Sequence, residues 1–438
     1  MNRPICIMGT GYVGMACMIG LAELGWTVHG CDNAPERIER LRAGTPPYRE
    51  DGLQEALRKH VANGRMHFFN SLEEAAKDSE LVLVAVGTPS REDGSADLAA
   101  LESALTELAG VRFAAWPTIV VRSTVPPGTC DAFAPFVEKW GELVYAPEFL
   151  REGTAVRDFL NPSRIVAGAR KASIAVPYVR LFEALQKRVI FTSLCNAELV
   201  KCCSNAFLAM KVTYANEVAN LCDALGANSD DVLRGIGYDP RIGPDFLRPG
   251  IGFGGPCFEK DVKSIKHVAT QLESSRELFS ATLRANDLQP MRVIETLSHE
   301  IGSLDGATIG VWGLAFKAGT DDIRSSLALR IVEELALRGA TITAYDPAVH
   351  LAPLPPGSRL VRSALEATDA DALLVLTDWP EFALIDPVVF APALRRRTVV
   401  DGCNILDPRR VASAGLVYRG IGRTALRAPA RFSYASAL

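Results

Sequence analysis

The hydrophobic positions in the first part of the chain fall into short continuous runs separated by helical patterns. Apolar runs occupy residues 4–8, 81–86 and 118–122, and such runs are typical of parallel strands that are buried on both faces. The first run leads into a helical pattern that ends near Leu24, and another strand is expected over residues 26–31. This alternation of strand and helix predicts an α/β domain with a parallel sheet.

A long helical pattern occupies the middle of the chain, from about residue 195 to residue 225. Neither proline nor glycine interrupts it before Gly226, so we expect one helix of about 30 residues that spans roughly 45 Å. A helix of this length can connect two domains, and it can offer a surface for dimerisation.

Strand-like runs return in the last third of the chain, together with a helical pattern over residues 325–338. The runs cover residues 308–312, 341–346, 372–377 and 398–401. They resemble a second Rossmann half, without the glycine motif of the first.

The predicted fold class is therefore α/β, with two Rossmann-like doubly wound parallel-sheet domains joined by a long central helix and a helical central domain. The expected domain boundaries are residues 1–193, 194–292 and 293–438. From Thr424 onward the tail is rich in Ala and Arg, and we expect it to be disordered or loosely packed.

The first strand ends in a glycine motif with the spacing of a dinucleotide-binding turn. Gly9, Gly11 and Gly14 form a G-x-G-x-x-G pattern between a strand and a helix. Gly9 permits the tight turn, Gly11 lets the backbone approach a pyrophosphate, and Gly14 allows close helix packing. Asp32 ends the second strand, where its carboxylate can accept from both ribose hydroxyls and would repel a 2′-phosphate. NAD is therefore the expected cofactor, in preference to NADP.

Two further loops follow strands at the same edge of this sheet. They cover residues 87–90 and 123–127, and loops at the carboxyl ends of parallel strands line the ligand crevice of such folds. We expect them to contact cofactor or substrate, although Gly, Pro and Ser are also ordinary turn residues.

Composition and charge restrict the partners. The 438 residues are 48% hydrophobic and 22% charged, with a net charge of −4, and this balance indicates no nucleic acid partner. No apolar run approaches the ~20 residues of a membrane span, and the apolar N-terminus is interpreted as a strand, not as an export signal. Ten cysteines show neither C-x-x-C pairs nor zinc spacing, so we expect reduced thiols, no metal site and a cytoplasmic protein.

The segment 252–261 carries the most reactive group in the chain. Cys257 follows a flexible glycine turn, and Lys260 and Asp261 come within four residues of it. A thiol on such a turn can attack a carbonyl, and nearby charges can tune it or activate water. Together with the dinucleotide motif, this segment suggests a dehydrogenase that passes through a covalent thioester.

Two pairs of residues four positions apart are further candidates. Glu148 and Glu152 would share a face if their segment were helical, although exposed charges are the usual explanation for such a pair. Lys201 and Asn205 lie on one face of the long helix. That face is otherwise small and apolar, so Lys201 needs a partner there; a solvated lysine on an exposed stripe is the competing interpretation.

Several segments, in the same order along the chain, resemble the UDP-glucose/GDP-mannose 6-dehydrogenase family. They are residues 9–14, 86–89, 123–126, 147–153, 201–208, 253–261 and 316–324. Residues 239–247 resemble the UDP-glucose branch of the family, whereas residues 316–324 are shared with the GDP-mannose branch. The similarity covers nearly the whole length of the chain.

The resemblance implies a four-electron oxidation that uses two NAD molecules. A primary alcohol at C6 of a sugar nucleotide is oxidised to an aldehyde and then to a carboxylate. Cys257 would add to the aldehyde as a thiolate to give a thiohemiacetal. The second hydride transfer would leave a thioester, and water would release the uronate. A covalent adduct cannot escape as a free aldehyde could.

The resemblance also implies roles for the matching residues. Lys201 would stabilise oxyanions at C6, Asp261 would hold or activate water with Lys201 and Thr124, and Glu148 would give general acid/base assistance through water. Asn205 would hold the sugar and completes the catalytic set. The residues expected to bind the cofactor are Gly9, Gly11, Tyr12, Val13, Gly14, Asp32, Arg37, Thr88, Pro89, Ser123, Thr124, Glu152, Lys260 and Arg324. Those expected to bind the substrate are Glu148, Phe149, Leu150, Arg151, Glu152, Lys201, Asn205, Arg241, Phe246, Leu247, Arg248, Gly254 and Lys317.

Three positions depart from the family pattern. Pro256 replaces the usual serine before the cysteine and removes an N–H from the turn. Glu259 replaces the usual proline and adds charge close to the thiol. Cys403 stands where members of the UDP-glucose branch typically have a substrate-binding arginine.

These motifs favour UDP-glucose as substrate and UDP-glucuronate as product, while GDP-mannose or another nucleotide hexose would use the same chemistry. A two-electron β-hydroxyacid dehydrogenase would share the Rossmann start and the long helix, but it gives no reason for Cys257 or for the second α/β domain. A nucleotide-sugar sensor without turnover would not need the catalytic set. The family and the long helix favour a homodimer in which Arg241 reaches the substrate of the neighbouring subunit.

Overall fold

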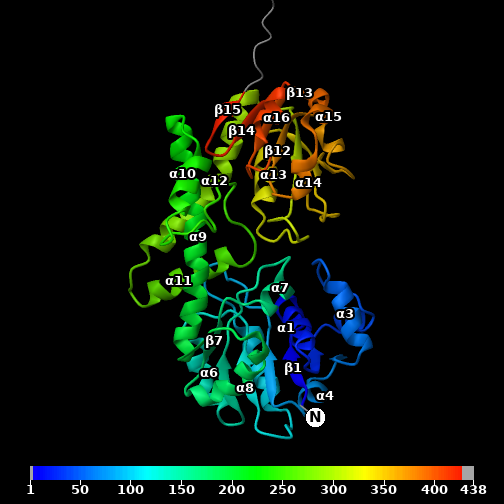
Figure 1. Cartoon of the computed structure of the whole chain (residues 1–438), viewed down its shortest axis with the longest axis vertical. Coiled ribbons are helices and arrows are strands. Elements are labelled where there is room, and N and C mark those ends of the chain that lie inside the picture. The colour runs from blue at the N-terminus through cyan, green and yellow to red at the C-terminus, as the bar shows by residue number, and fades with distance from the viewer. Residues whose placement is uncertain (1–2, 427–438) are drawn as a thin grey trace, which may run out of the picture. The chain divides into compact units, whose positions relative to one another are not determined.

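The computed structural model describes residues 3–426, which form two compact units. The first unit extends as far as Ala206 and takes in Lys260–Arg276, whereas the second comprises Phe207–Glu259 and the residues from Glu277 onward. Two helices, α9 (Leu194–Leu225) and α11 (Phe258–Gln271), continue from one unit into the other, and both are labelled in Figure 1.

The first unit is built on one eight-stranded sheet with the strand order β3-β2-β1-β4-β5-β6-β7-β8. Neighbouring strands are parallel, except for the antiparallel pair β6 and β7. The strands are β1 (Ile5–Met8), β2 (Val28–Cys31), β3 (Met66–Phe69), β4 (Leu81–Val84), β5 (Thr118–Val121), β6 (Glu142–Tyr145), β7 (Ile165–Gly168) and β8 (Val189–Thr192). The strand order reverses between β1 and β4, which is the switch point where such sheets bind ligands.

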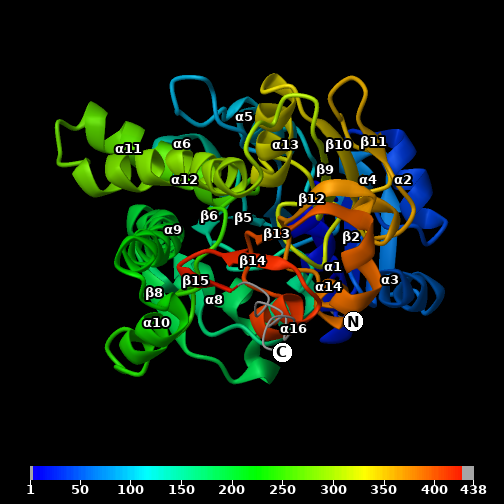
Figure 2. The ribbon, with the colours of Figure 1, turned by 90° about the horizontal axis from the view of Figure 1, so that it is seen from above.

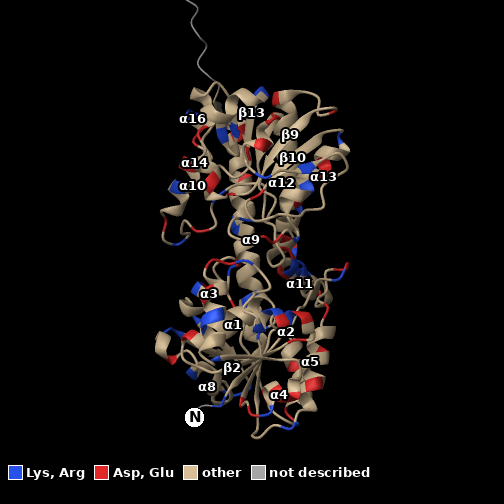
Figure 3. Cartoon of the chain, turned by 90° about the vertical axis from the view of Figure 1, so that its right-hand side faces the viewer, with Lys and Arg blue, Asp and Glu red and all other residues tan. Residues whose placement is uncertain are grey.

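Helices cover both faces of this sheet. They are α1 (Tyr12–Glu23), α2 (Pro35–Arg42), α3 (Leu53–Ala62), α4 (Leu72–Ala76), α5 (Ala99–Ala109), α6 (Thr129–Val137), α7 (Ala155–Leu160) and α8 (Ala172–Arg180), with a 3₁₀ turn at Glu183–Leu185. Successive strand residues enter different cores, because side chains alternate across a sheet. Ile5 and Ile7 pack with Met15 of α1, whereas Cys6 packs with Leu105 of α5. Charged side chains lie on the surrounding helices, such as α5, and the strands are almost free of them (Figure 3).

The second unit contains a seven-stranded sheet with the order β11-β10-β9-β12-β13-β14-β15, in which only β14 and β15 are antiparallel among the described strands. The strands are β9 (Thr308–Trp312), β10 (Thr341–Tyr345), β11 (Arg359–Leu360), β12 (Ala370–Val375), β13 (Leu394–Asp401), β14 (Val417–Gly420) and β15 (Arg423–Leu426). The helices are α10 (Ser229–Gly237), α12 (Glu277–Ile301), α13 (Leu327–Leu337), α14 (Pro380–Leu384), α15 (Pro387–Phe390) and α16 (Pro408–Ser413), with 3₁₀ turns at Glu366–Thr368 and Ala391–Ala393.

This second sheet is also buried on both faces. Ile309 of β9 packs with Val293 of α12 and Ile331 of α13 on one side, and Trp312 packs with Phe382 of α14 on the other. Helix α16 lies beside the last parallel strand, β14, in both views of the ribbon (Figures 1 and 2).

The structure confirms the α/β fold class and the long central helix. The expectation of a disordered or loosely packed tail is wrong for its first three residues. Residues 424–426 belong to β15, because their backbone pairs with β14, while residues 427–438 lie outside the described part of the chain. Residues 146–153 are not helical, so Glu148 and Glu152 do not share a helix face.

Candidate active site

The turn between β1 and α1 requires glycine at two of its three glycine positions. Gly9 has a φ of 92°, and a Cβ there would lie 2.5 Å from the carbonyl oxygen of Ala85. A Cβ on Gly14 would lie 1.9 Å from the carbonyl oxygen of Gly9, so only glycine lets α1 pack this closely. A Cβ on Gly11, in contrast, would meet nothing within 4 Å. The protein itself leaves this space open, at the helix terminus where a phosphate would bind.

The carboxylate of Asp32 accepts hydrogen bonds from this turn. One oxygen, Oδ2, accepts from the N–H and the hydroxyl of Thr10 at 2.8 and 2.9 Å and from Nη1 of Arg37 at 2.9 Å, and Oδ1 accepts from the Ala34 N–H at 3.1 Å. Burial alone would raise the pKa of Asp32, but these donors and the charge of Arg37 hold it below its ordinary value. Asp32 is therefore an anion that can accept from ribose hydroxyls.

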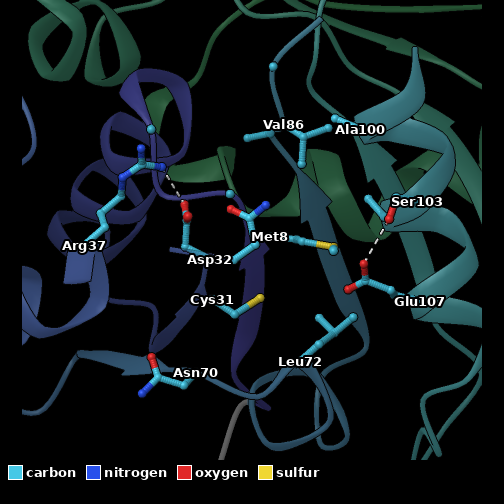
Figure 4. Close-up of a pocket in the computed structure, with 16 residues that line it drawn as sticks. Met8, Cys31, Asp32, Arg37, Asn70, Leu72, Val86, Ala100, Ser103 and Glu107 are labelled. Atoms are coloured by element: carbon cyan, nitrogen blue, oxygen red, sulfur yellow. Dashed lines mark hydrogen bonds and ion pairs between the residues drawn. The ribbon is translucent and has the colours of Figure 1, made fainter. Parts of the chain in front are cut away.

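Asp32 and Arg37 form one side of a cavity of about 510 Å³, which Gly9, Gly11 and Val86 also line. Figure 4 shows the Asp32–Arg37 pair on one side and the hydrogen-bonded pair of Ser103 and Glu107 on the other. This volume is in the range of small-molecule sites. An anion placed for ribose and an open helix N-terminus fit NAD, which supplies a hydride acceptor when bound. Sequence reasoning missed the lining residues Asn33, Asn70, Leu72, Ala100, Ser103, Ala104 and Glu107.

Two cofactor candidates in the first turn of α1 point elsewhere. The hydroxyl of Tyr12 donates to Oε2 of Glu50 at 2.9 Å and contacts the carbonyl oxygen of Arg151 at 3.0 Å. Burial and the nearby carboxylates of Glu50 and Glu152 raise the pKa of Tyr12. Val13 packs against the core. Tyr12 thus connects the cofactor turn to the loop that carries the substrate candidates.

The loops after β4 and β5 are joined by two hydrogen bonds. The hydroxyl of Thr88 donates to the carbonyl oxygen of Thr124 at 2.6 Å, and that of Ser123 donates to the carbonyl oxygen of Val86 at 2.7 Å. Thr88, Ser123 and Thr124 therefore lie together after two neighbouring strands of the sheet.

Glu148 and Lys201 form a buried ion pair. The exposed fractions of the two residues are 8% and 3%, and Nζ of Lys201 donates to Oε1 of Glu148 at 2.9 Å. The second carboxylate oxygen accepts from the Leu150 N–H at 2.6 Å. Burial would raise the pKa of Glu148, but the charge and hydrogen bond of Lys201, the Leu150 N–H and the charge of Arg122 hold it below its ordinary value. The partner that Lys201 requires is thus present, and the solvated-lysine interpretation is wrong.

One turn further along α9, Asn205 contacts the other carboxylate of the catalytic set. Its Nδ2 donates to Oδ2 of Asp261 at 2.6 Å, and Nζ of Lys260 donates to Oδ1 of Asp261 at 2.7 Å. Asp261 is 1% exposed. Because Lys201 and Asn205 are four positions apart, they present an ammonium and an amide on the same face of α9.

In the second unit, hydrogen bonds hold the turn before Cys257 in place. The N–H and carbonyl of Phe253 bond to the side chain of Asn286 at 2.7 and 3.0 Å, and those of Gly250 bond to Asn216 and Gln289 at 2.7 and 2.9 Å. A Cβ on Gly254 would lie 2.8 Å from the Ser325 carbonyl oxygen, and one on Gly255 would lie 2.5 Å from the ring of Phe316. The glycines at 254 and 255 therefore serve close packing.

Cys257 is exposed and immediately precedes α11, whose first turn carries Lys260 and Asp261. Connectivity alone keeps the Cα atoms of Cys257 and Asp261 within about 14 Å of each other. No disulfide forms among the described cysteines, which agrees with the expectation of reduced thiols.

The other substrate candidates of the second unit have varied surroundings. Arg241 is exposed and donates to the carboxylate of Asp239. Leu247 is buried, and Phe246, with a φ of 63°, packs its ring near that of Phe258. The cofactor candidate Arg324 donates to the carboxylate of Asp322. Lys317 lies earlier in the same loop, where its ammonium is near the ring of Phe316.

Cys403 lies near one of these candidates, Arg248. Burial and the charges of Asp401 and Asp378 raise the pKa of the Cys403 thiol well above its usual range, and the charge of Arg248 opposes them. A cation is therefore present near the position where the family pattern has an arginine.

Sequence reasoning also missed Arg122 and Asn286. A charged residue at the end of the buried run 118–122 was a visible signal for Arg122, which is 5% exposed. Asn286 lies within a helical pattern, and nothing in that pattern marks it.

Neither a membrane-spanning helix nor a metal cluster is found in the described residues. Over residues 3–426, no helix combines the length and the apolar character that crossing a membrane requires. Within the same residues, no group of three or more His, Cys, Asp and Glu side chains is arranged to hold a metal ion.

Comparison with known proteins gives matches along most of the chain. Residues 3–186 match the NAD-binding domain of the UDP-glucose/GDP-mannose dehydrogenase family, residues 195–288 its central domain and residues 310–408 its UDP-binding domain. UDP-glucose 6-dehydrogenase TuaD of Bacillus subtilis is 36% identical, over 97% of this chain and 94% of the relative. A UDP-glucose 6-dehydrogenase of Rhizobium meliloti is 37% identical, over 96% of this chain and 99% of the relative.

Solved structures agree with these relatives. A UDP-glucose dehydrogenase from the hyperthermophilic archaeon Pyrobaculum islandicum has a TM-score of 0.90 and 36% identity, over 97% of this chain and 98% of that one. A UDP-D-ManNAc dehydrogenase from Pyrococcus horikoshii has a TM-score of 0.85 and 27% identity, over 96% and 99%. With its NAD site, its two parallel-sheet units and these matches, the chain belongs to the UDP-glucose/GDP-mannose dehydrogenase family and is an NAD-dependent nucleotide-sugar dehydrogenase.

Proposed function

We propose that the enzyme oxidises UDP-glucose to UDP-glucuronate with two NAD molecules, through a thioester on Cys257. The observation that carries the proposal is the buried Lys201–Glu148 pair, with the Asn205–Asp261 pair one turn further along α9. The relatives named UDP-glucose 6-dehydrogenase, at 36–37% identity over nearly their whole length, support the choice of substrate.

Lys201 supplies the positive charge that this oxidation needs at C6. Removal of the C6 hydroxyl proton creates a developing alkoxide, and a buried ammonium stabilises such an oxyanion more strongly than water does. Glu148 is ionised because its pKa is held low. It therefore acts as a base, directly or through water, and not as a donor of protons.

Cys257 captures the aldehyde that the first oxidation produces. Its thiolate forms a bond to C6, and the carbonyl electron pair moves to oxygen, which is then protonated to give the thiohemiacetal. Oxidation of this adduct removes the hydrogen of C6 with its two electrons as hydride, and the hydroxyl proton leaves to a base as the C6 carbonyl of the thioester forms. Bound NAD would supply the hydride acceptor. Water then attacks the thioester carbonyl, the C–S bond breaks, and the thiol and the carboxylate are released. Asp261, held by Asn205 and Lys260, is the proposed partner of that water.

The remaining site assignments keep their predicted roles as proposals. Gly9, Gly11, Asp32 and Arg37 bind NAD, as the cavity they line supports. The loop residues Phe149 to Glu152 bind the sugar. Phe246, Leu247, Arg248, Gly254 and Lys317 bind the nucleotide diphosphate.

We also propose a three-domain organisation with boundaries at residues 1–193, 194–292 and 293–438, which the three family matches support, in a cytoplasmic homodimer. Exposed apolar side chains recur on α9 at Phe207, Tyr214, Leu221 and Leu225, with the spacing of a helix face. A monomeric mass by light scattering in a fully active preparation would contradict the dimer.

The test of the reaction is the yield of NADH per sugar nucleotide. Purified enzyme is expected to form two NADH per UDP-glucose, and Cys257→Ser is expected to lose net four-electron turnover by at least about 10³-fold. The matched control is Cys203→Ser, another exposed cysteine, which should retain wild-type turnover. Full four-electron turnover by Cys257→Ser would refute the thioester.

A second candidate substrate is another nucleotide hexose, such as GDP-mannose or UDP-ManNAc. Cys403 stands at the arginine position of the UDP-glucose branch, and the UDP-D-ManNAc dehydrogenase of Pyrococcus horikoshii shares 27% identity over 96% of this chain. Parallel assays with UDP-glucose, GDP-mannose and UDP-ManNAc separate the candidates. A kcat/KM for UDP-glucose below that of either rival would overturn the assignment.

A further inference from the structure

Arg122 is a fully buried cation that the proposed mechanism does not use. It follows β5 and is 5% exposed. Its Nη1, which carries two hydrogens, shares them among three acceptors: the carbonyl oxygens of Ala146 and Pro147 at 2.8 and 3.1 Å and the hydroxyl of Tyr178 at 2.6 Å. Its Nε has no acceptor in good hydrogen-bond geometry among the described residues, and the thiol of Cys17, a weak acceptor, lies beside the guanidinium. Burial of this charge is destabilising for the fold alone, so its place requires another explanation.

The carbonyl oxygens that Arg122 binds belong to the segment that leads to Glu148. Ala146 and Pro147 are the two residues before Glu148, in a segment without regular secondary structure. Neither a helix nor a strand fixes the backbone there, so Nη1 of Arg122 performs that function through the two carbonyl oxygens. The hydroxyl of Tyr178 on α8 keeps the guanidinium in position from the other side.

Charge gives Arg122 a second effect on Glu148. Lys201 of α9 and the Leu150 N–H contact the Glu148 carboxylate, and the charge of Arg122, after β5, acts on it as well. The thiol of Cys17 on α1 lies beside Arg122 and within the field of Glu148. One carboxylate is thus shared by two buried cations. The cluster keeps a net charge of +1, whereas an isolated Lys201–Glu148 pair would be neutral.

We propose that Arg122 is a positioning residue for the oxidation: it fixes the backbone before Glu148 and shares the charge of that carboxylate, so that the positive charge of Lys201 remains available to the oxyanion at C6. The inference rests on the proposed function, because it assigns Arg122 to the same oxidation. It adds a residue that touches neither the reacting atoms nor the cofactor turn.

Replacement of the charge gives the largest expected effect. Arg122→Gln should lower kcat about 100-fold, with KM for NAD unchanged within about twofold. The acid limb of the pH profile of kcat/KM should move to higher pH, because Glu148 loses one of the two cations that keep it ionised. Arg122→Lys should restore the position of the acid limb and only part of kcat, because the shorter lysine side chain does not reach as far as Nη1 of the arginine.

The matched control is Tyr145→Phe, in the neighbouring strand β6. Tyr145 is fully buried, like Arg122, and its hydroxyl has no hydrogen-bond partner among the described residues. It should change neither kcat nor the acid limb by more than about twofold. An Arg122→Gln enzyme with the kcat and the acid limb of this control would overturn the proposal.

A double-mutant cycle with Glu148→Gln separates positioning from simple damage to the fold. If Arg122 acts through Glu148, Arg122→Lys should cost less than about threefold in kcat in the Glu148→Gln background. If its loss there equals the loss in the wild type, the proposal is wrong. This cycle decides the question even if Arg122→Gln fails to fold, as judged by circular dichroism.

Each enzyme is assayed with the sugar nucleotide that the wild type oxidises best. A wild type that oxidises none refutes the proposed function and this inference with it. An active wild type with unchanged Arg122 variants refutes only the inference.

Discussion

The two parallel sheets begin with the same turn but use it differently. Gly9 follows β1 with a φ of 92°, and Gly313 follows β9 with a φ of 95°. A Cβ at either glycine would collide with a residue that follows the neighbouring strand, Ala85 in the first unit and Thr377 in the second. Beyond this point only the first unit continues directly into a helix, at Tyr12, while in the second the helix begins at Leu327.

The acid at the end of the next strand shows the same divergence. Asp32 accepts two backbone N–H groups, and its other partners are the side chains of Thr10 and Arg37, which can move aside for a ligand. Asp346 accepts from four backbone N–H groups and from Nε1 of Trp379. Its capacity is therefore saturated by the protein, and it holds loops together instead of binding ribose.

This difference shows that a Rossmann-like sheet does not by itself make a dinucleotide site. What distinguishes the first unit is an acid with exchangeable partners, an open position at Gly11 and the cavity between them. The second unit lacks the second and third glycines and uses its acid internally, so it can bind a nucleotide only by other contacts.

The largest effect is expected from a methyl group added to the turn of the first unit. A methyl group removed at the equivalent position of the second unit serves as the comparison. Gly14→Ala places a Cβ 1.9 Å from a backbone oxygen, so the turn must shift, and NAD affinity should fall by more than about 100-fold. Ala318, five residues after Gly313 as Gly14 is after Gly9, lies in a loop. Ala318→Gly should change stability by less than about 1 kcal/mol and leave NAD affinity unchanged. Fluorescence titration with NADH and thermal melting measure both.

Replacement of Asp32 or of Asp346 should give the next largest effect. The first change should mainly affect KM for NAD, and the second should mainly affect stability. Asp32→Asn should raise KM for NAD by about 30- to 100-fold, because a charge-assisted bond to ribose is lost. It should destabilise the fold less than Asp346→Asn does, because Asp32 accepts from two backbone N–H groups and Asp346 from four. Asp346→Asn should reduce the free energy of unfolding by about 2–4 kcal/mol, because an amide nitrogen would face backbone N–H groups. KM for NAD should stay within about twofold. A loss of NAD affinity in Asp346→Asn with an unchanged melting temperature would mean that Asp346, and not only Asp32, serves the cofactor.

The two units should also differ in how a buried carboxylate of each, Glu148 or Asp401, makes stability depend on pH. Ionic partners hold the pKa of Glu148 below 4.5, whereas burial raises the pKa of Asp401 above 3.8. Glu148 therefore contributes stability that is present above pH 4.5 and is lost as the pH falls through its folded pKa. Asp401 contributes stability that is fully present below pH 3.8 and is lost as the pH rises through its folded pKa.

The corresponding variants should diverge by about 1 kcal/mol or more over this range. Relative to the wild type, Glu148→Gln should lose unfolding free energy as the pH rises from about 3 to 5, while Asp401→Asn should gain it as the pH rises from about 4 upward. Urea unfolding at several pH values measures the difference. Parallel pH curves for the wild type and Asp401→Asn would contradict the raised pKa.

The sequence was a good guide to these features where one residue carries its own signal. Gly9 and Gly14 are glycines because backbone atoms collide there, and the motif shows this directly; a lysine on an apolar helix face, such as Lys201, predicts a buried partner. The partner itself, Glu148, lies 53 residues away, and only the fold brings it there. Arg122 and Asp346 were not recognised for the same reason, since their roles depend on carbonyl and N–H groups that no side-chain pattern records.

The smallest expected effects come from the side chains that complete each acid's environment. Trp379→Phe removes one donor at 3.2 Å from Asp346, which should cost about 0.5–1.5 kcal/mol in unfolding free energy without any effect on NAD. Arg37→Gln removes a partner of Asp32 whose side chain is 41% exposed, so stability should change by less than about 1 kcal/mol. KM for NAD should rise by about three- to tenfold, because Arg37 lines the cofactor cavity. Both variants could instead show similar small losses of stability with KM for NAD unchanged. In that case the partners of Asp32 would be as structural as those of Asp346, and the distinction between the two units would rest on the glycines alone.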